Sequence, residues 1–90
     1  MKRLKVVFQG RVQGVGFRYM TERLARHYPV TGHVRNTQHG TVELLAEGEE
    51  KVLQDFLNAI RESPLGAHIS DLDVAWAPAE GKWKSFGIQF

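Results

Sequence analysis

No cysteine occurs among the 90 residues, which excludes disulfide bonds, catalytic thiolates and metal sites built on cysteine. No apolar run approaches the length of about 20 residues that a membrane-spanning helix needs. The formal net charge is only +2, too small to indicate a nucleic-acid binder. With 42% hydrophobic and 24% charged residues, the composition is that of a globular protein. We therefore expect a single cytoplasmic domain over residues 1–90 that binds neither nucleic acid nor membrane.

Hydrophobic periodicity predicts five strands and two helices. Apolar and polar residues alternate over residues 4–9, 30–35, 41–47, 72–76 and 86–90, as in half-buried strands. A first helix is predicted from the helical spacing of Phe17, Met20, Leu24 and Tyr28, and it should end before Pro29. The apolar stripe of a second helix comprises Val52, Leu53, Phe56, Leu57 and Ile60.

The order of these elements predicts the fold. It reads β-α-β-β-α-β with a short C-terminal strand, the α+β, ferredoxin-like split βαβ sandwich: an antiparallel sheet with two helices on one face. The turn at residues 36–40 should make a hairpin of the second and third strands. A polar turn at residues 78–82 should make a last hairpin, near which Trp76, Trp83 and Phe86 pack. This fold carries many functions and does not settle this one.

Residues 10–18 read Gly-Arg-Val-Gln-Gly-Val-Gly-Phe-Arg and lie between the first strand and the first helix. Glycines allow a loop to turn its N–H groups inward. A helix N-terminus and the guanidinium of Arg18 favour the same guest, a phosphate-like anion. Taken alone, the stretch fits a phosphate-binding loop and a simple glycine-rich turn equally well.

Asn36 opens the predicted hairpin turn. In a split βαβ unit the first strand pairs with the third, so the turn before the third strand should lie near the glycine loop. Its carboxamide both accepts and donates hydrogen bonds, so it could hold a water molecule. Phosphoryl transfer depends mostly on positioning and charge stabilisation. The alternative is a turn residue that tolerates left-handed backbone angles.

The two stretches together resemble the acylphosphatase family. Its first signature, Gly-x-Val-Gln-Gly-Val-x-Phe-Arg, is matched in full by residues 10–18. Its second, Gly-aromatic-Val-Arg-Asn-x-x-x-Gly-x-Val, is matched by residues 32–42 except that His33 replaces the aromatic. Gly48 falls where a later glycine of the family belongs. At His33 we expect a flat packing substitute rather than a pH-sensitive contact.

The resemblance implies a hydrolase of the carboxyl–phosphate bond of small acyl phosphates. It implies no cofactor, no metal and no covalent intermediate, and we expect a monomer. The family's catalytic arginine and water-orienting asparagine correspond to Arg18 and Asn36. Its phosphate-binding loop corresponds to Gln13, Gly14, Val15, Gly16 and Phe17, acting chiefly through backbone N–H groups.

Other functions find less support in the sequence. Gly14 and Gly16 begin a Gly-x-Gly-x-x-Gly pattern, but Tyr19 stands at the third glycine. An RNA-binding sheet needs stacking aromatics on its central strands, and the outward residues predicted there include none. The histidine spacings place no pair on one helical face for a metal. An accessory domain of a larger maturation enzyme acting on carbamoyl phosphate is the remaining alternative to the independent enzyme that we expect.

Overall fold

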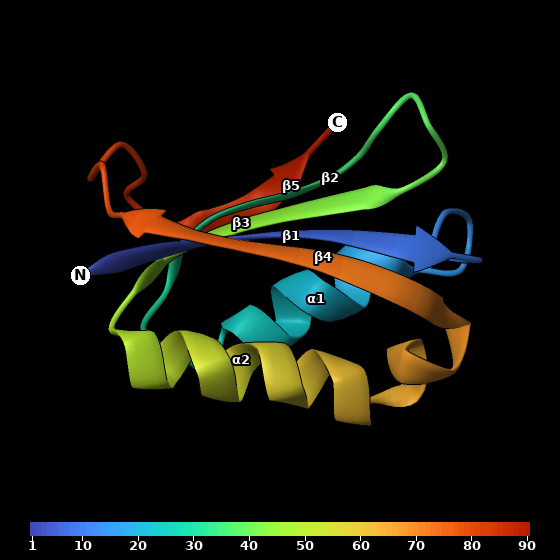
Figure 1. The fold of residues 1–90 in the computed structure, drawn as a ribbon, viewed down its shortest axis with the longest axis horizontal. Helices are drawn as coiled ribbons and strands as arrows, with labels where there is room; N and C mark the ends of the chain where they lie inside the picture. The colour runs from blue at the N-terminus through green and yellow to red at the C-terminus, as the bar shows by residue number, and fades with distance from the viewer.

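The computed structural model describes residues 1–90 and contains one five-stranded sheet, two α-helices and a short 3-10 helix, η1. The elements are β1 (Lys2–Gly10), α1 (Phe17–Ala25), β2 (Thr31–Asn36), β3 (Val42–Gly48), α2 (Glu50–Glu62), η1 (Pro64–His68), β4 (Ile69–Pro78) and β5 (Phe86–Gln89). The strand order is β4-β1-β3-β2-β5. Both helices lie against one face of the sheet and leave the other open (Figure 1). The predicted fold is therefore confirmed.

The predicted alternation decides which side chains fill the space between sheet and helices. Leu4, Val6 and Phe8 of β1 have no exposed surface, and the same holds for Val42 and Leu44 of β3. From α2, the buried residues are Leu53, Phe56, Leu57 and Ile60. Removing such aliphatic and aromatic surface from water is the main favourable term in folding, at about 25 cal/mol per Å². No helix is long and apolar enough to cross a membrane.

The first helix is shorter than predicted and buries a different face. It ends at Ala25, three residues before Tyr28, because the N–H groups of residues 26–28 bond to carbonyls three residues back and tighten the last turn. Its fully buried residues are Phe17, Thr21 and Ala25, whereas Met20 and Leu24 are only partly buried. Tyr28 still reaches the core, with its ring 5.6 Å from that of Phe56.

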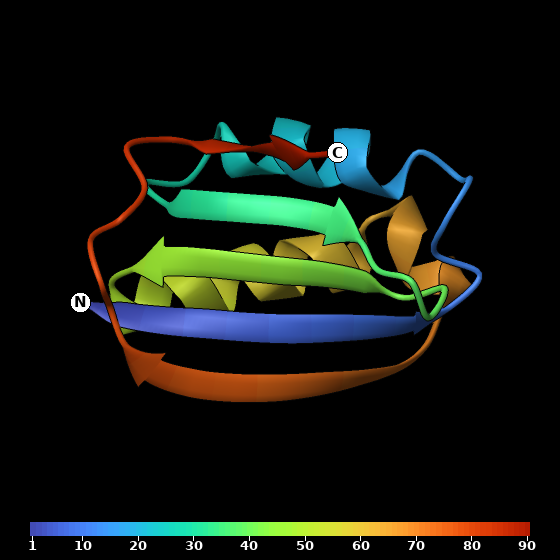
Figure 2. The same ribbon diagram turned by 90° about the horizontal axis from the view of Figure 1, so that it is seen from above.

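The predicted last hairpin does not form. Strands β4 and β5 lie at opposite edges of the sheet, and β5 pairs parallel with β2, the one parallel pair in the sheet. The connecting segment crosses one end of the sheet (Figure 2). The buried carboxylate of Glu47 accepts hydrogen bonds from the N–H groups of Glu80 (2.7 Å) and Gly81 (2.9 Å) and so anchors that segment. Phe86 then packs edge-on against Phe56, with 5.7 Å between ring centroids.

Candidate active site

The glycine loop and the hairpin turn lie at the same end of the sheet in both views (Figures 1 and 2). Antiparallel pairing of β1 with β3 places Phe8 opposite Val42, and pairing of β2 with β3 places Asn36 opposite the same Val42. Asn36 is therefore level with Phe8, near the C-terminal end of β1, and only β3 lies between the two strands. The topology brings together the two stretches that the sequence predicted to converge.

Gly14 and Gly16 give the loop its shape. Their φ angles are +78° and +76°, in the left-handed region that residues with a Cβ rarely enter. A Cβ added at either position would meet no atom within 4 Å. Glycine is therefore required at both positions because of the backbone angle. A side chain would find enough space there. Gly16 is the N-cap of α1, and its carbonyl accepts the hydrogen bond from the Met20 N–H at 3.0 Å.

A cavity of about 170 Å³ lies between the loop, the start of α1 and the end of β2. Its lining residues are Val12, Gly14, Gly16, Phe17, Arg18, Tyr19 and Asn36. Since a water molecule occupies about 30 Å³ in the liquid, the space suits a phosphoryl group with a water molecule beside it. Three larger hollows, of about 510, 310 and 230 Å³, lie elsewhere on the surface and contain neither Arg18 nor Asn36.

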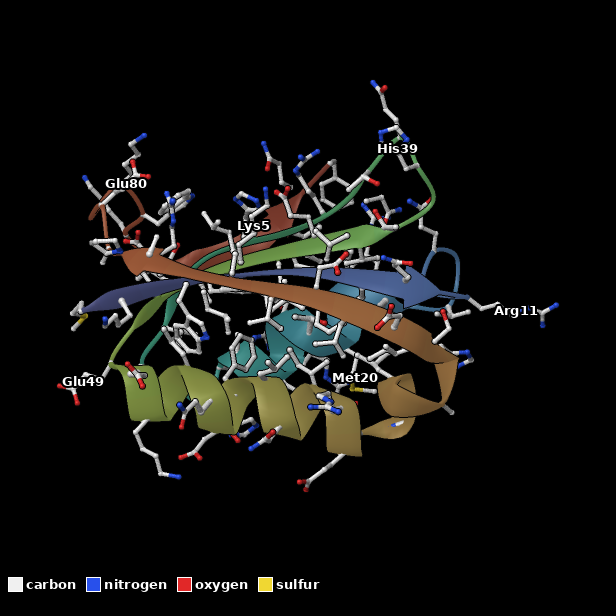
Figure 3. All side chains as sticks on the ribbon, in the orientation of Figure 1. Lys5, Arg11, Met20, His39, Glu49 and Glu80 are labelled. Carbon is white, nitrogen blue, oxygen red and sulfur yellow. The ribbon has the colours of Figure 1, made fainter.

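Arg18 carries a charge that no carboxylate neutralises. It lies in the first turn of α1, and none of the ion pairs in the structure involves it. The Phe90 ring lies against its guanidinium, with Cζ 5.0 Å from the ring centroid. Such a cation–π contact orients the guanidinium without removing its charge. Arg11, at the base of the same loop, points away from the body of the molecule (Figure 3).

Asn36 is the last residue of β2, so its backbone is held by the sheet. Its side chain lines the cavity, and its carboxamide makes no side-chain hydrogen bond within the protein. Both its acceptor and its donors therefore remain available to a guest in the cavity.

Gln13 lies beside the cavity and does not line it. Its Nε2 donates hydrogen bonds to the carbonyl oxygens of Thr37 and Thr41, each at 2.9 Å. The two threonine hydroxyls are 2.6 Å apart, and the Thr37 N–H donates to the Thr41 carbonyl at 3.0 Å. The Gln13 side chain thus joins the glycine loop to the turn that follows Asn36. The sequence motif showed Gln13 but gave no sign of these partners.

Two other predicted loop residues differ in their placement. The Val15 side chain is exposed and does not line the cavity, whereas Phe17 lines the cavity and is buried against Phe8, with ring centroids 5.0 Å apart. Tyr19 lines the cavity and was not predicted to. Its position directly after Arg18 at the start of a helix was the available signal.

His33 was expected to act as a flat packing residue, and it packs on an aromatic ring and also contacts a charge. Its ring meets Trp83 edge-on at 5.9 Å, and its Nε2 lies 3.0 Å from Oε2 of Glu43. Arg35 donates to both Glu43 oxygens, at 2.9 and 3.2 Å. Burial by itself raises the pKa of Glu43, but the hydrogen bonds from Arg35 and His33 outweigh it and hold that pKa below its ordinary value.

Comparison with known proteins identifies the family. A model of the acylphosphatase family matches residues 4–88. The chain belongs to the acylphosphatase family. An acylphosphatase from Salinibacter ruber is 42% identical over 88 residues, which are 98% of this chain and 93% of that protein. The crystal structure of acylphosphatase from Bacillus subtilis superposes with a TM-score of 0.90 at 36% identity and covers all of both chains.

Membership of the acylphosphatase family makes the chain an enzyme that hydrolyses acyl phosphates, as the two motifs predicted. The same fold also occurs within a larger protein. A structure of full-length HypF in its phosphate- and nucleotide-bound form has a TM-score of 0.85 at 30% identity, over all of this chain but only 12% of that one.

Proposed function

We propose that this acylphosphatase hydrolyses acyl phosphates to a carboxylate and inorganic phosphate without a metal ion or a covalent intermediate. One observation carries the proposal: an unpaired arginine, Arg18, and an uncommitted carboxamide, that of Asn36, line the same cavity. In this scheme Arg18 binds the phosphoryl group and Asn36 orients the attacking water.

Arg18 supplies the positive charge that phosphoryl transfer needs. Its guanidinium is planar, permanently charged and able to donate two parallel hydrogen bonds to phosphate oxygens. Charge builds on the equatorial oxygens as the bond to the leaving group breaks, so a fixed cation beside them stabilises the transition state. The backbone N–H groups of residues 13–17, at the N-terminus of α1, add to this field.

Asn36 acts on the water and not on the phosphate. Its oxygen accepts a hydrogen bond from the water, and the water's oxygen then faces phosphorus in line with the leaving carboxylate. A carboxylate leaves readily, so little help from a general acid is needed. The water's proton passes to a phosphate oxygen of the substrate, and the cavity lining contains no carboxylate or histidine to compete for it.

An isotope experiment tests this chemistry. Hydrolysis of benzoyl phosphate in ¹⁸O-labelled water, in the presence of a metal chelator, should place the label in inorganic phosphate and leave benzoate unlabelled. Label in benzoate would mean that water attacks the carbonyl carbon, which contradicts the roles given to Arg18 and Asn36. Loss of turnover with the chelator, restored by a divalent cation, would contradict the metal-free scheme.

We also propose that residues 1–90 act as one domain, as a cytoplasmic monomer. The sheet supports the single domain, because its interior strand β1, from the start of the chain, pairs with β4 from the last third of the chain. Light scattering after size-exclusion chromatography should give a mass near 10.2 kDa. Cell fractionation should recover the activity in the cytoplasmic fraction.

A further inference from the structure

Exposed apolar side chains are concentrated around the cavity. Six large apolar side chains are exposed in the whole protein: Met1, Val15, Tyr19, Val74, Trp76 and Phe90. Three of the six adjoin the site: Tyr19 lines the cavity, Val15 lies between the two lining glycines, and the Phe90 ring rests on Arg18. We refer to Val15, Tyr19 and Phe90 as the apolar collar. Their exposed fractions are 39%, 58% and 87%.

Exposed apolar surface gathered at the mouth of a polar cavity is typical of a site for an amphipathic ligand. Each Å² of this apolar surface that a ligand covers would contribute about 25 cal/mol to the binding free energy. The other three exposed residues do not line the cavity or contact Arg18: Met1 precedes β1, and Val74 and Trp76 lie on the edge strand β4.

The chemistry of the substrate places its hydrocarbon at this collar. In an acyl phosphate the carbonyl carbon is two bonds from phosphorus, and the organic group is attached to that carbon. The phosphoryl group and the attacking water take up most of a cavity of about 170 Å³, and the remaining space is too small for a benzoyl group. The organic group must therefore leave the cavity at its mouth.

We propose that the apolar collar, with Tyr19 as its principal member, binds the acyl group and makes the enzyme prefer acyl phosphates with aromatic or longer aliphatic groups. This inference rests on the proposed function, because it takes the phosphoryl group to occupy the cavity beside Arg18. Tyr19 is a specificity-determining residue in this scheme, and it contacts the substrate through its ring. The ring contact exists before and during the reaction, so it changes KM more than kcat.

The first experiment compares KM and kcat for acetyl and benzoyl phosphate. Wild type should have the lower KM for benzoyl phosphate. Tyr19→Ala should raise that KM roughly 5- to 10-fold, as expected for loss of about 50 Å² of apolar contact, and the KM for acetyl phosphate about twofold at most. Tyr19→Phe should behave as wild type. Equal KM values in wild type, or the same loss in Tyr19→Phe, would overturn the proposal.

A matched pair of isosteric substitutions separates the collar from exposed apolar surface elsewhere. Val15→Thr should raise the KM for benzoyl phosphate about twofold, because it replaces one collar methyl with a hydroxyl. Val74→Thr makes the same change on β4 at a residue of similar exposure, 44%, and should leave the ratio of the two KM values as in wild type. Equal effects of the two substitutions would overturn the proposal.

Binding of non-hydrolysable analogues keeps the test independent of turnover. By calorimetry, wild type should bind phenylphosphonate more tightly than methylphosphonate, and Tyr19→Ala should reduce that preference roughly 5- to 10-fold. If wild type shows this preference but hydrolyses neither acyl phosphate, the proposed function fails and the collar stands. If wild type hydrolyses both substrates but the preference is unchanged in Tyr19→Ala, the collar fails and the proposed function stands. If neither phosphonate binds, the collar fails.

Discussion

Two arginines of this chain have opposite surroundings, although both occur in the family motifs. Arg35 lies on the open face of the sheet, where Glu43 accepts two of its hydrogen bonds and raises the pKa of its guanidinium. Arg18 lies at the end of the sheet, without a carboxylate and beside a cavity. The charge of Arg35 is used within the fold, whereas that of Arg18 is available to an anion. From this difference in partners we expect a structural role for Arg35 and a binding role for Arg18.

The largest expected effect is the loss of activity in Arg18→Ala, which should distinguish Arg18 from Arg35. Arg18→Ala should lower kcat/KM by roughly 10³-fold or more, because it removes a fixed cation from the developing phosphoryl charge. The unfolding free energy should change little, since Arg18 forms no ion pair. Steady-state kinetics and urea unfolding measure both. Arg11→Ala, in the same loop but pointing outward, is the control and should keep its activity (Figure 3).

Asn36→Ala should have the second-largest effect on activity. We expect kcat to fall roughly 10²- to 10³-fold, as for loss of one preorganised hydrogen-bonding group. The KM should change less than kcat, because in the proposed scheme Asn36 acts on the water. Asn58→Ala, on the exposed side of α2, provides the matched control for loss of a carboxamide. A variant of Asn36 with wild-type kcat would show that another group positions the water.

Gln13→Ala tests how the two halves of the site are held together. The loss removes one donor from each of the two carbonyls, of which that of Thr41 keeps the Thr37 N–H, and should lower the unfolding free energy by about 1–2 kcal/mol. We expect kcat to fall roughly 10-fold, since small misplacements of reacting groups are costly. Kinetics combined with hydrogen exchange of residues 37–41 should show the turn loosening. Unchanged exchange in this turn would argue against a positioning role.

Arg35→Ala should show the reverse of Arg18→Ala. We expect the unfolding free energy to fall by about 1–2 kcal/mol, because Glu43 is left largely buried with fewer donors. The value of kcat/KM should stay within about threefold of wild type, since Arg35 does not line the cavity and the effect of a structural ion pair is mainly on stability. Thermal unfolding and kinetics on the same samples measure both quantities. A large loss of activity at unchanged stability would undo the comparison.

The smallest expected effect is a pH dependence of stability. Because the folded-state pKa of Glu43 lies below the ordinary value of 4.5, its contribution is fully present above that pH and is lost as the pH falls through the folded-state pKa. The difference in unfolding free energy between wild type and Glu43→Gln should therefore shrink as the pH is lowered from 6 to 3. A difference that grows on acidification would contradict the assigned direction.

Local patterns were enough to predict the five strands, the two α-helices and the meeting of the two motifs, but not η1 or the early end of α1. The alternation of Leu4, Val6 and Phe8 has the period of a strand, and strand order in the split βαβ unit then places Asn36 near the loop. The placement of β5 could not be predicted in this way. Its parallel pairing with β2 follows a long connection that is hydrogen-bonded to Glu47, and no local pattern records that contact.

The hydrogen-bond and ion-pair partners of these residues could not be predicted from the sequence either. The motif contains Gln13, but its bonds to carbonyls 24 and 28 residues away are set by the folded hairpin. The ion pair of Arg35 likewise follows from its register opposite Glu43. That Arg18 has no such partner emerges only when every carboxylate has been placed. The motifs therefore predicted that Arg18 and Asn36 lie close together, and the fold determined which charges remain free.

Binding of inorganic phosphate tests most directly whether Arg18 holds the available charge. Calorimetric titration should give similar affinities for wild type and Arg35→Ala, and a loss of at least tenfold for Arg18→Ala, since a charged hydrogen-bonding partner contributes about 1.5–3 kcal/mol. That pattern would place the anion beside the unpaired arginine. Wild-type affinity in Arg18→Ala, or a comparable loss in folded Arg35→Ala, would contradict the account.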